Sequence, residues 1–117
     1  MQLGMVGLGR MGLNMAQRLI RGGHEPVGFD LKAAARKALQ DKVGAAAATL
    51  QGLVTALTEP RVIWIMVPAG QITDETVDAL LPMLAAGDTV IDGGNSNYKD
   101  TLRRAGRYAA KGLGYVD

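Results

Sequence analysis

The sequence has no cysteine and only one histidine, one tryptophan and one phenylalanine among its 117 residues. Without cysteine, the chain can form neither a disulfide bond nor a thiolate zinc site, which is consistent with a reducing compartment. No apolar run approaches the roughly 20 residues that a membrane-spanning helix needs. The predicted first strand begins at Leu3, without a preceding basic stretch or a small-residue cleavage site, so we expect no signal peptide. These absences predict a cytoplasmic protein without a membrane partner.

Neither sign of charge dominates the sequence. Lys and Arg number 13 and Asp and Glu number 11, which gives a formal net charge of +2. The basic residues are scattered, so the chain lacks the basic patch of a nucleic-acid-binding protein. Repeats, low-complexity tracts and linkers are absent as well. A chain of this length without internal boundaries predicts one domain with a single core.

Glycine is abundant, and the first glycines form a motif. An apolar strand predicted at residues 3–8 runs into Gly7-Leu8-Gly9-Arg10-Met11-Gly12. A helical stretch at 13–21 and a short strand at 27–29 follow, and the second strand ends at Asp30. Strand, G-x-G-x-x-G, helix, strand and acid, in this order, are typical of a dinucleotide-binding βαβ unit.

The residue types in this unit suit a dinucleotide. Gly7 permits the tight turn after the strand, Gly9 lets the backbone approach a pyrophosphate, and Gly12 lets the helix pack against the strand. The N–H groups at the helix N-terminus attract the diphosphate. Asp30 would accept hydrogen bonds from a ribose 2′-hydroxyl and repel a 2′-phosphate, so the site favours NAD over NADP. A cap of the following helix is the alternative role for Asp30.

Strands and helices alternate along the rest of the chain. Further strands are predicted at 45–48, 62–67, 89–91 and 114–117, and further helices at 31–42, 50–57, 73–86 and 98–111. This alternation with short connections predicts an α/β domain with a doubly wound parallel sheet, the Rossmann fold, in the strand order 3-2-1-4-5-6. The ligand crevice then lies at the carboxyl ends of the strands, where the order reverses.

Several side chains have a plain structural interpretation. Trp64, within the apolar run at 62–67, is expected in the core rather than under a base. Met11 is expected to pack inside, although its backbone belongs to the phosphate loop. The last helix is expected to turn three small or apolar residues inward, namely Leu102, Ala105 and Ala109.

Three segments resemble decarboxylating 6-phosphogluconate dehydrogenase, most of all its shorter bacterial form, and the similarity covers the whole chain. They are the glycine motif, Met66-Val67-Pro68-Ala69-Gly70, and Asp92-Gly93-Gly94-Asn95-Ser96-Asn97-Tyr98. The third segment discriminates best, because related 3-hydroxyisobutyrate and tartronate-semialdehyde dehydrogenases have an Asp-x-Ser-Thr-like segment there. Tyr98 and Arg103 also match the phosphogluconate enzymes; the alternative is that they only pack the helix and form part of a solvated helix face.

The resemblance implies a substrate and a reaction. The family oxidises 6-phospho-D-gluconate at C3 with hydride transfer to a nicotinamide cofactor, and loss of carbon dioxide gives ribulose 5-phosphate in the pentose phosphate pathway. By position, the residues from Gly7 to Gly12 would cradle the pyrophosphate. Val67, Pro68 and Ala69 would lie along the ribose and adenine, and Asn95 would touch both cofactor and substrate. A turn residue is the alternative role for Asn95.

The chain departs from the family pattern in two places. NADP-using members have an Asn-Arg-Thr-like segment after the second strand, whereas this chain has Asp30-Leu31-Lys32, which supports NAD with NADP as the less favoured cofactor. The family continues beyond Asp117 into a substrate loop, a catalytic Lys and Glu, and a helical dimerising domain. We therefore expect no catalytic residue and no turnover in this chain alone, and a homo-oligomer for the full protein.

Other functions stay open on the sequence alone. The chain is either the cofactor domain of an oxidoreductase, including a related 3-hydroxyacid dehydrogenase, or a stand-alone NAD-sensing module. Binding of another adenine nucleotide or of S-adenosylmethionine is disfavoured by the regular glycine spacing together with Asp30. His24 precedes the second strand, at the edge of the sheet away from the crevice, and is not expected to be catalytic. No metal site is predicted.

Overall fold

A computed structural model describes residues 1–42, 44–67, 71–93 and 98–116 of the chain. The strands are β1 (Gln2–Val6), β2 (Glu25–Phe29), β3 (Ala45–Ala46), β4 (Val62–Ile65), β5 (Thr89–Asp92) and β6 (Gly114–Val116). The helices are α1 (Arg10–Arg21), α2 (Ala33–Gln40), α3 (Leu50–Ala56), α4 (Gln71–Leu80), the 3-10 turn η1 (Leu81–Met83) and α5 (Tyr98–Ala109). Within these ranges, no helix is both long and apolar enough to cross a membrane.

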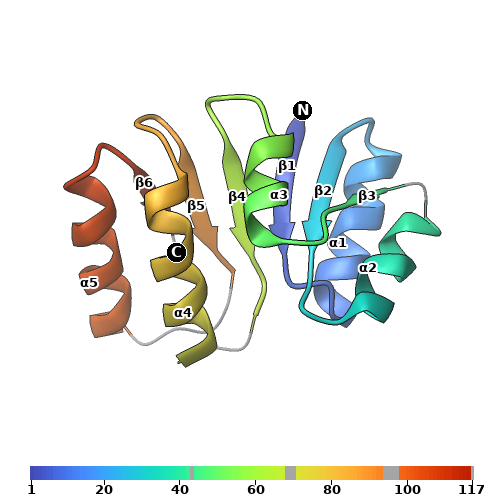
Figure 1. The fold of residues 1–117 in the computed structure, drawn as a ribbon, viewed down its shortest axis with the longest axis horizontal. Coiled ribbons are helices and arrows are strands. Elements are labelled where there is room, and N and C mark those ends of the chain that lie inside the picture. Colours follow the sequence, from blue (N-terminus) through green and yellow to red (C-terminus); the bar gives the residue numbers. More distant parts are fainter. Residues whose placement is uncertain (43, 68–70, 94–97, 117) are drawn as a thin grey trace.

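All six strands form one parallel sheet in the order β3-β2-β1-β4-β5-β6 (Figure 1). The predicted Rossmann fold and strand order are therefore confirmed. The chain starts at the centre of the sheet, builds outward to β3, returns through α3 to β4, and builds outward to β6. Because the direction of building reverses between β1 and β4, the loops that follow these two strands diverge and leave a crevice at their carboxyl ends.

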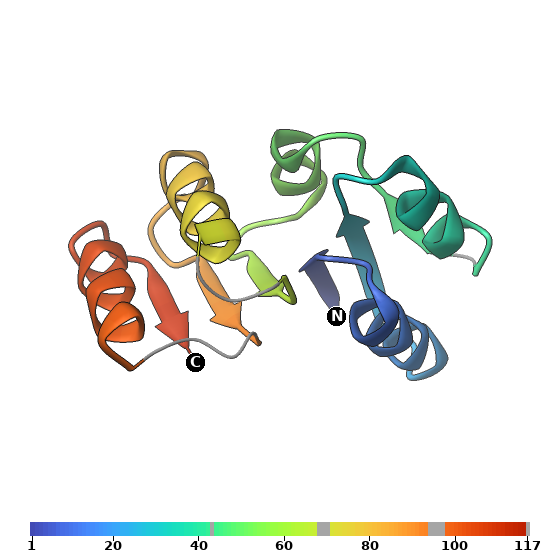
Figure 2. The same cartoon turned by 90° about the horizontal axis from the view of Figure 1, so that it is seen from below.

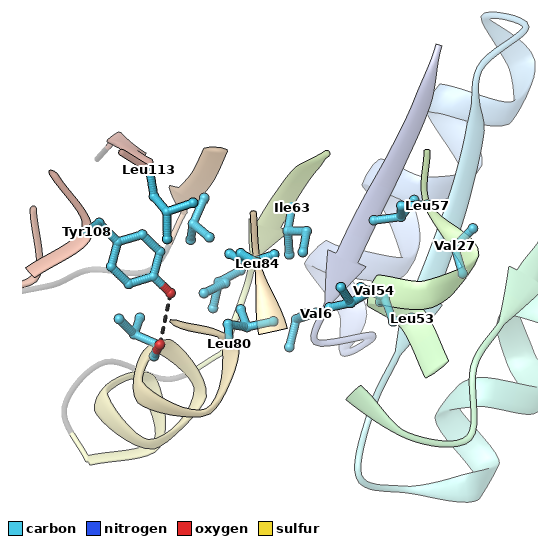
Figure 3. Close-up of a cluster of buried hydrophobic side chains, with 13 residues drawn as sticks. Val6, Val27, Leu53, Val54, Leu57, Ile63, Leu80, Leu84, Tyr108 and Leu113 are labelled. Carbon is cyan, nitrogen blue, oxygen red and sulfur yellow. Dashed lines mark hydrogen bonds between the residues drawn. The ribbon is translucent and has the colours of Figure 1, made fainter. Parts of the chain in front are cut away.

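The two faces of the sheet carry separate cores. Figure 2 shows α3 and α4 on one side of the sheet and α1 on the other. Successive residues of a strand point to opposite faces, so Val6 joins the cluster beneath α3, α4 and α5, whereas Met5 joins the cluster beneath α1 and α2. Figure 3 shows the larger cluster, in which Leu53 of α3 and Leu80 of α4 pack with Ile63 of β4. These aliphatic contacts hold the helices that shape the crevice.

Four helices, α2 to α5, are shorter than the sequence predicted, and the early end of α4 has a clear physical cause. The helix predicted at 73–86 begins at Gln71 and ends at Leu80, and Pro82 lies in the 3-10 turn that follows. Proline lacks the N–H that would continue the α-helical hydrogen bonding, and its ring clashes with the preceding turn. The α-helix therefore stops before Pro82 instead of bending around it.

The predicted inward face of α5 is wrong for Leu102 and Ala109, whereas Ala105 is half-buried. Leu102 is 57% exposed and Ala109 is exposed, whereas Arg104 and Tyr108 are fully buried. Two polar side chains can face the core because each finds a polar partner there. The Tyr108 hydroxyl donates to the carbonyl oxygen of Val77 at 2.8 Å, and Arg104 forms ion pairs.

Trp64 packs on the α1 side of the sheet, against the cluster that contains Met5, and is half-buried. Its expected place in the core is thus confirmed in part. Trp64, Ile91 and Val116 are aligned across β4, β5 and β6, and Val116 is exposed. The α1 side of the sheet is consequently more open at β6 than at β1.

A pair of leucine variants tests which helix faces form the core. Leu53→Ala removes a fully buried side chain and should lower the free energy of unfolding by about 2–5 kcal/mol, because a cavity remains. Leu102→Ala removes an exposed one and should change it by less than about 0.5 kcal/mol. Chemical denaturation followed by circular dichroism measures both. A large loss for Leu102→Ala would contradict the orientation of α5.

Candidate functional site

A cavity of about 590 Å³ opens at the carboxyl ends of β1, β2 and β4, where the strand order reverses. Its walls are mostly apolar, with Asp30, Lys32 and Glu75 as the charged residues among those that line it. The other lining residues are Val6, Gly7, Gly9, Phe29, Leu31, Ala35, Leu50, Met66, Val67, Ile72, Thr76 and Ala79. An apolar cleft with few polar groups at this point of a doubly wound sheet is typical of a nucleotide site.

The turn between β1 and α1 is tight at two glycines. Gly7 has a φ of +99°, and a Cβ on it would lie 2.5 Å from the carbonyl oxygen of Met66. A Cβ on Gly12 would overlap the carbonyl oxygen of Gly7. The Gly7 N–H donates to the Phe29 carbonyl oxygen at 2.9 Å. These contacts join β1, β2 and β4 at the base of the crevice and bring α1 close to the sheet.

Gly9 differs from its two neighbours in the motif. A Cβ on Gly9 would meet nothing within 4 Å, and its φ of −67° is open to any residue. Gly9 is the N-cap of α1, which has no side-chain cap and no acid in its first turn. The N–H groups and the positive end of the helix dipole at this terminus favour an anion. The space at Gly9 is therefore open for a ligand.

The remaining residues of the motif have different surroundings. Leu8 is buried, and its N–H donates to Asp30 Oδ2 at 2.8 Å. The side chains of Arg10 and Met11 are exposed. The expected packing of Met11 is wrong, since 69% of it is exposed, because this part of the first turn of α1 faces away from the sheet. Only the backbone of Met11 remains a candidate for the phosphate loop.

Asp30 connects the glycine loop to the start of α2. Its Oδ2 accepts from the Leu8 N–H, and its Oδ1 accepts from the Lys32 N–H at 2.9 Å. Lys32, not Asp30, occupies the N-cap position of α2. Arg36 Nη1 donates to the Asp30 carbonyl oxygen at 2.7 Å and to that of Leu31 at 3.3 Å. A carboxylate has about four lone-pair positions, so two backbone bonds leave Asp30 able to accept from a ligand hydroxyl.

The structure describes only some of the predicted site residues beyond Asp30. Val67 lies on the wall of the cavity. Pro68, Ala69 and Asn95 lie outside the described residues. Gly93, two residues before Asn95, follows β5, and its N–H donates to the Ile65 carbonyl oxygen at 2.8 Å. The start of the segment after β5 is thus fixed to the end of β4.

His24 lies where the sequence predicted. It immediately precedes β2, and its Nδ1 is 3.2 Å from the amino group of Met1. This is the edge of the sheet opposite the crevice, because Asp30 follows the other end of β2. Within the described part of the chain, no group of three acidic or histidine side chains could hold a metal ion.

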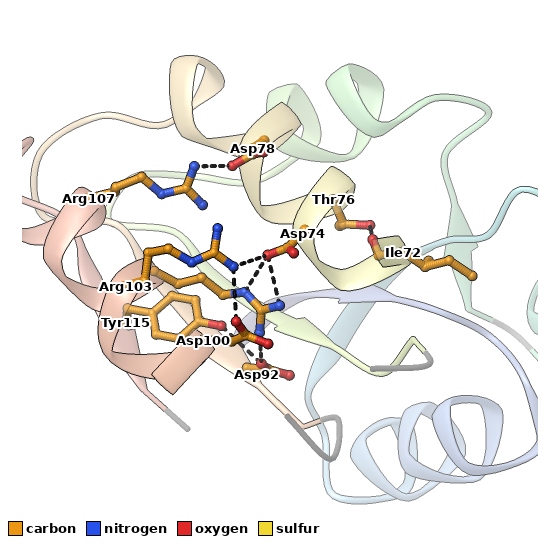
Figure 4. A network of polar contacts seen from close by, with 10 residues as sticks. Ile72, Asp74, Thr76, Asp78, Asp92, Asp100, Arg103, Arg107 and Tyr115 are labelled. Atoms are coloured by element: carbon orange, nitrogen blue, oxygen red, sulfur yellow. Dashed lines mark hydrogen bonds and ion pairs between the residues drawn. The ribbon is translucent and has the colours of Figure 1, made fainter. Parts of the chain in front are cut away.

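Sequence reasoning missed a buried ion cluster beside the crevice (Figure 4). Arg104 of α5 pairs with Asp74 of α4 at 2.9 Å and with Asp92 of β5 at 3.5 Å. The Tyr115 hydroxyl of β6 donates to Asp92 Oδ2 at 2.9 Å. The four-residue spacing of Arg104 and Tyr108 on one face of α5 was the available signal. This spacing does not identify the partners, Asp92 and Asp74, which lie 12 and 30 residues away from Arg104 in the sequence.

The ionisation of this cluster follows from its contacts. The hydrogen bond from Arg104, together with the charges of Arg104 and Arg103, holds the pKa of Asp74 below its usual range, although burial opposes this. Burial and the hydrogen bond to Asp92 raise the pKa of Tyr115 to about 12. Tyr115 is therefore a neutral donor near pH 7, and the cluster combines one buried cation with two carboxylates.

A sequence profile described as the NAD binding domain of 6-phosphogluconate dehydrogenase matches residues 2–117. The chain belongs to this family. A 6-phosphogluconate dehydrogenase of Haloferax volcanii, named as NAD(+)-dependent and decarboxylating, is 47% identical over 105 residues, which cover 90% of the chain and 35% of that protein. The decarboxylating 6-phosphogluconate dehydrogenase of Bacillus licheniformis is 37% identical over an alignment of 118 positions, which covers 97% of the chain and 25% of that protein.

Solved structures of the 6-phosphogluconate dehydrogenase family and of a related enzyme share the fold. The Plasmodium falciparum 6-phosphogluconate dehydrogenase, described with NADP+ and with 6-phosphogluconate, matches with a TM-score of 0.91 and 25% identity, over 98% of the chain and 26% of that structure. The Mycobacterium tuberculosis 3-hydroxyisobutyrate dehydrogenase matches with a TM-score of 0.85 and 22% identity, over 97% of the chain and 38% of that structure. The chain thus spans about a quarter to two fifths of these relatives.

Two alanine variants separate the structural and binding roles of the motif. Gly12→Ala should lower the free energy of unfolding by about 1–3 kcal/mol or more, because its Cβ overlaps the Gly7 carbonyl oxygen. Gly9→Ala should cost less than about 1 kcal/mol, yet weaken NAD binding at least about tenfold, or 1.4 kcal/mol, since its methyl group enters the cavity. Denaturation and calorimetry measure the two effects. Unchanged NAD affinity in Gly9→Ala would exclude Gly9 from the binding surface.

Proposed function

We propose that the chain is the cofactor-binding domain of a decarboxylating 6-phosphogluconate dehydrogenase and that it binds NAD in preference to NADP. The observation that carries the cofactor preference is Asp30, a carboxylate on the wall of the cavity that is hydrogen-bonded to the glycine loop. Family membership and an uncapped helix N-terminus at the same cavity support binding of the dinucleotide. The Haloferax relative, which is named as NAD(+)-dependent, agrees with the preference.

In this proposal the pyrophosphate passes over Gly9 and meets the first N–H groups of α1. The adenosine ribose donates its hydroxyls to the lone pairs that Asp30 keeps free of backbone bonds. The adenine lies against the apolar wall, which includes Leu31 and Ile72, and Val67, Pro68 and Ala69 lie along the ribose and adenine. The nicotinamide half extends towards the ends of β4 and β5, where Asn95 contacts both cofactor and substrate.

The preference for NAD is an electrostatic argument. A 2′-phosphate in place of the ribose hydroxyl would bring negative charge next to Asp30, and like charges at this distance repel. Lys32 is the nearby cation that would lessen the repulsion, since it follows Asp30 by two residues and lines the same cavity. Arg36 binds the carbonyl oxygens of Asp30 and Leu31, which leaves this guanidinium less available for a phosphate.

The proposed reaction belongs to the full-length protein. In this reaction 6-phospho-D-gluconate is oxidised at C3, and the bound NAD accepts the hydride. Decarboxylation then gives ribulose 5-phosphate, in the pentose phosphate pathway of the cytoplasm. Because the chain spans about a quarter to two fifths of its relatives, we assign the catalytic base and acid and the oligomer contacts to the parts of those proteins that it does not cover. A related 3-hydroxyacid dehydrogenase is the second candidate, because such an enzyme shares the fold. The segment Asp92-Gly93-Gly94-Asn95-Ser96 favours the first candidate.

Cofactor preference can be measured on this chain. In calorimetry, NAD should bind at least about tenfold more tightly than NADP, a difference of about 1.4 kcal/mol. Asp30→Ala should narrow this ratio, because it removes both the partner of the hydroxyl and the repulsion of the phosphate. Lys32→Ala is the matched control and should widen the ratio, because it removes the nearby cation. Equal affinities of the unaltered chain for NAD and NADP would contradict the role of Asp30.

Turnover should be absent from the chain alone. NADH formation, followed at 340 nm with NAD and 6-phosphogluconate, should not exceed the rate without 6-phosphogluconate. The full-length Haloferax relative serves as the positive control under the same conditions. Turnover that depends on 6-phosphogluconate would show that this chain holds a general base.

A further inference from the structure

Arg104 is a fully buried cation in a domain whose core is otherwise built mainly from apolar side chains. Its Nε and Nη2 both lie 2.9 Å from Asp74 Oδ1, and its Nη1 lies 3.5 Å from Asp92 Oδ2. A buried ion cluster of this kind is often no more stabilising than apolar side chains of similar volume. Stability alone is thus a weak reason for an arginine at this position, and the location of the cluster indicates another role.

The cluster lies between the carboxyl end of β5 and the first turn of α4. Asp92 is the last residue of β5, and Gly93 follows it directly. Asp74 lies in the first turn of α4, and the next two residues, Glu75 and Thr76, line the cavity. Arg104 therefore joins the carboxyl end of β5 to the first turn of α4 through a single guanidinium.

The contacts of Gly93 tightly constrain the position of its neighbour Asp92. A Cβ on Gly93 would overlap Trp64 Nε1 and Met66 Sδ, and the Gly93 N–H donates to the Ile65 carbonyl oxygen. Replacement of Arg104 by an uncharged residue removes this ion pair from the buried Asp92, so the carboxylate must shift or rearrange its remaining contacts. Either change disturbs the residue that leads into Gly93. In contrast, α4 stays anchored through Val77 and Leu80, which are fully buried.

We propose that Arg104 is a positioning residue for the nicotinamide half of the dinucleotide, acting through Asp92 and Gly93 at the carboxyl end of β5. The proposal rests on the proposed binding of NAD. The cavity beside Asp30 takes the adenosine half, so the ends of β4 and β5, beyond the reversal of strand order, take the other half. Arg103 has a different role, since it is half-exposed and pairs with Asp74 and Asp100 at the surface (Figure 4).

The test compares three ligands on three forms of the chain. AMP probes the adenosine half, ADP-ribose adds everything except nicotinamide, and NAD is complete. The forms are the unaltered chain, Arg104→Met and the matched control Arg103→Met, and calorimetry measures each affinity. In Arg104→Met we expect the affinity for AMP to stay within about threefold and the advantage of NAD over ADP-ribose to fall by about tenfold. Arg103→Met should retain both.

Two further variants keep the test decisive. Arg104→Lys retains the charge without the planar fork and should restore part of the advantage of NAD over ADP-ribose. If circular dichroism shows that Arg104→Met does not fold, Tyr115→Phe decides, because it removes only the hydroxyl that donates to Asp92. Tyr115→Phe should then reduce this advantage and leave AMP binding unchanged.

The outcomes separate this proposal from the proposed function. A proportional loss for all three ligands, or no loss for any, would overturn the positioning role. Equal affinities of the unaltered chain for NAD and ADP-ribose would overturn it too, while NAD binding would stand. Failure of the unaltered chain to bind NAD at all would instead overturn the proposed function.

Discussion

The structure depends on the close approach of α1 to the turn that follows β1. The Gly7 carbonyl oxygen occupies the space that a Cβ on Gly12 would need, and Gly7 itself lies against the Met66 carbonyl oxygen. Only residues without a side chain permit both contacts. They bring the N-terminus of α1 to the carboxyl edge of the sheet between β1 and β4, where the strand order reverses. The crevice, its anion-attracting end and the placement of Asp30 beside Leu8 follow from this geometry.

Asp30, the residue to which we assign the cofactor preference, also has a structural role. Its two carboxylate oxygens hold the N–H groups of Leu8 and Lys32, which ties the phosphate loop to the turn before α2. A replacement that adapts the pocket to a 2′-phosphate would therefore also loosen the loop that receives the pyrophosphate. Adaptation of such a site to NADP needs a substitute for both backbone hydrogen bonds as well as a cation for the phosphate.

Much of the fold and part of the site could be predicted because they depend on local pattern. Apolar strands such as 62–67 alternate with helical stretches, and the glycine spacing with Asp30 defines the βαβ unit. The interior face of α5 could not be predicted in this way. Arg104 and Tyr108 turn inward because their polar partners lie on other elements, namely Asp74, Asp92 and the Val77 carbonyl oxygen. The periodicity of one helix does not reveal partners that are distant in sequence. It therefore selected the apolar Leu102, which the structure exposes.

Trp64 is the only tryptophan of the chain, and its position makes it a built-in optical probe. The indole is half-buried, and its Nε1 lies against Gly93 and near Met66, at the ends of β4 and β5. Tryptophan emission responds to the polarity and polarisability around the ring, and a single fluorophore gives a signal without overlap. Events at this side of the crevice can thus be followed by intrinsic fluorescence without a label.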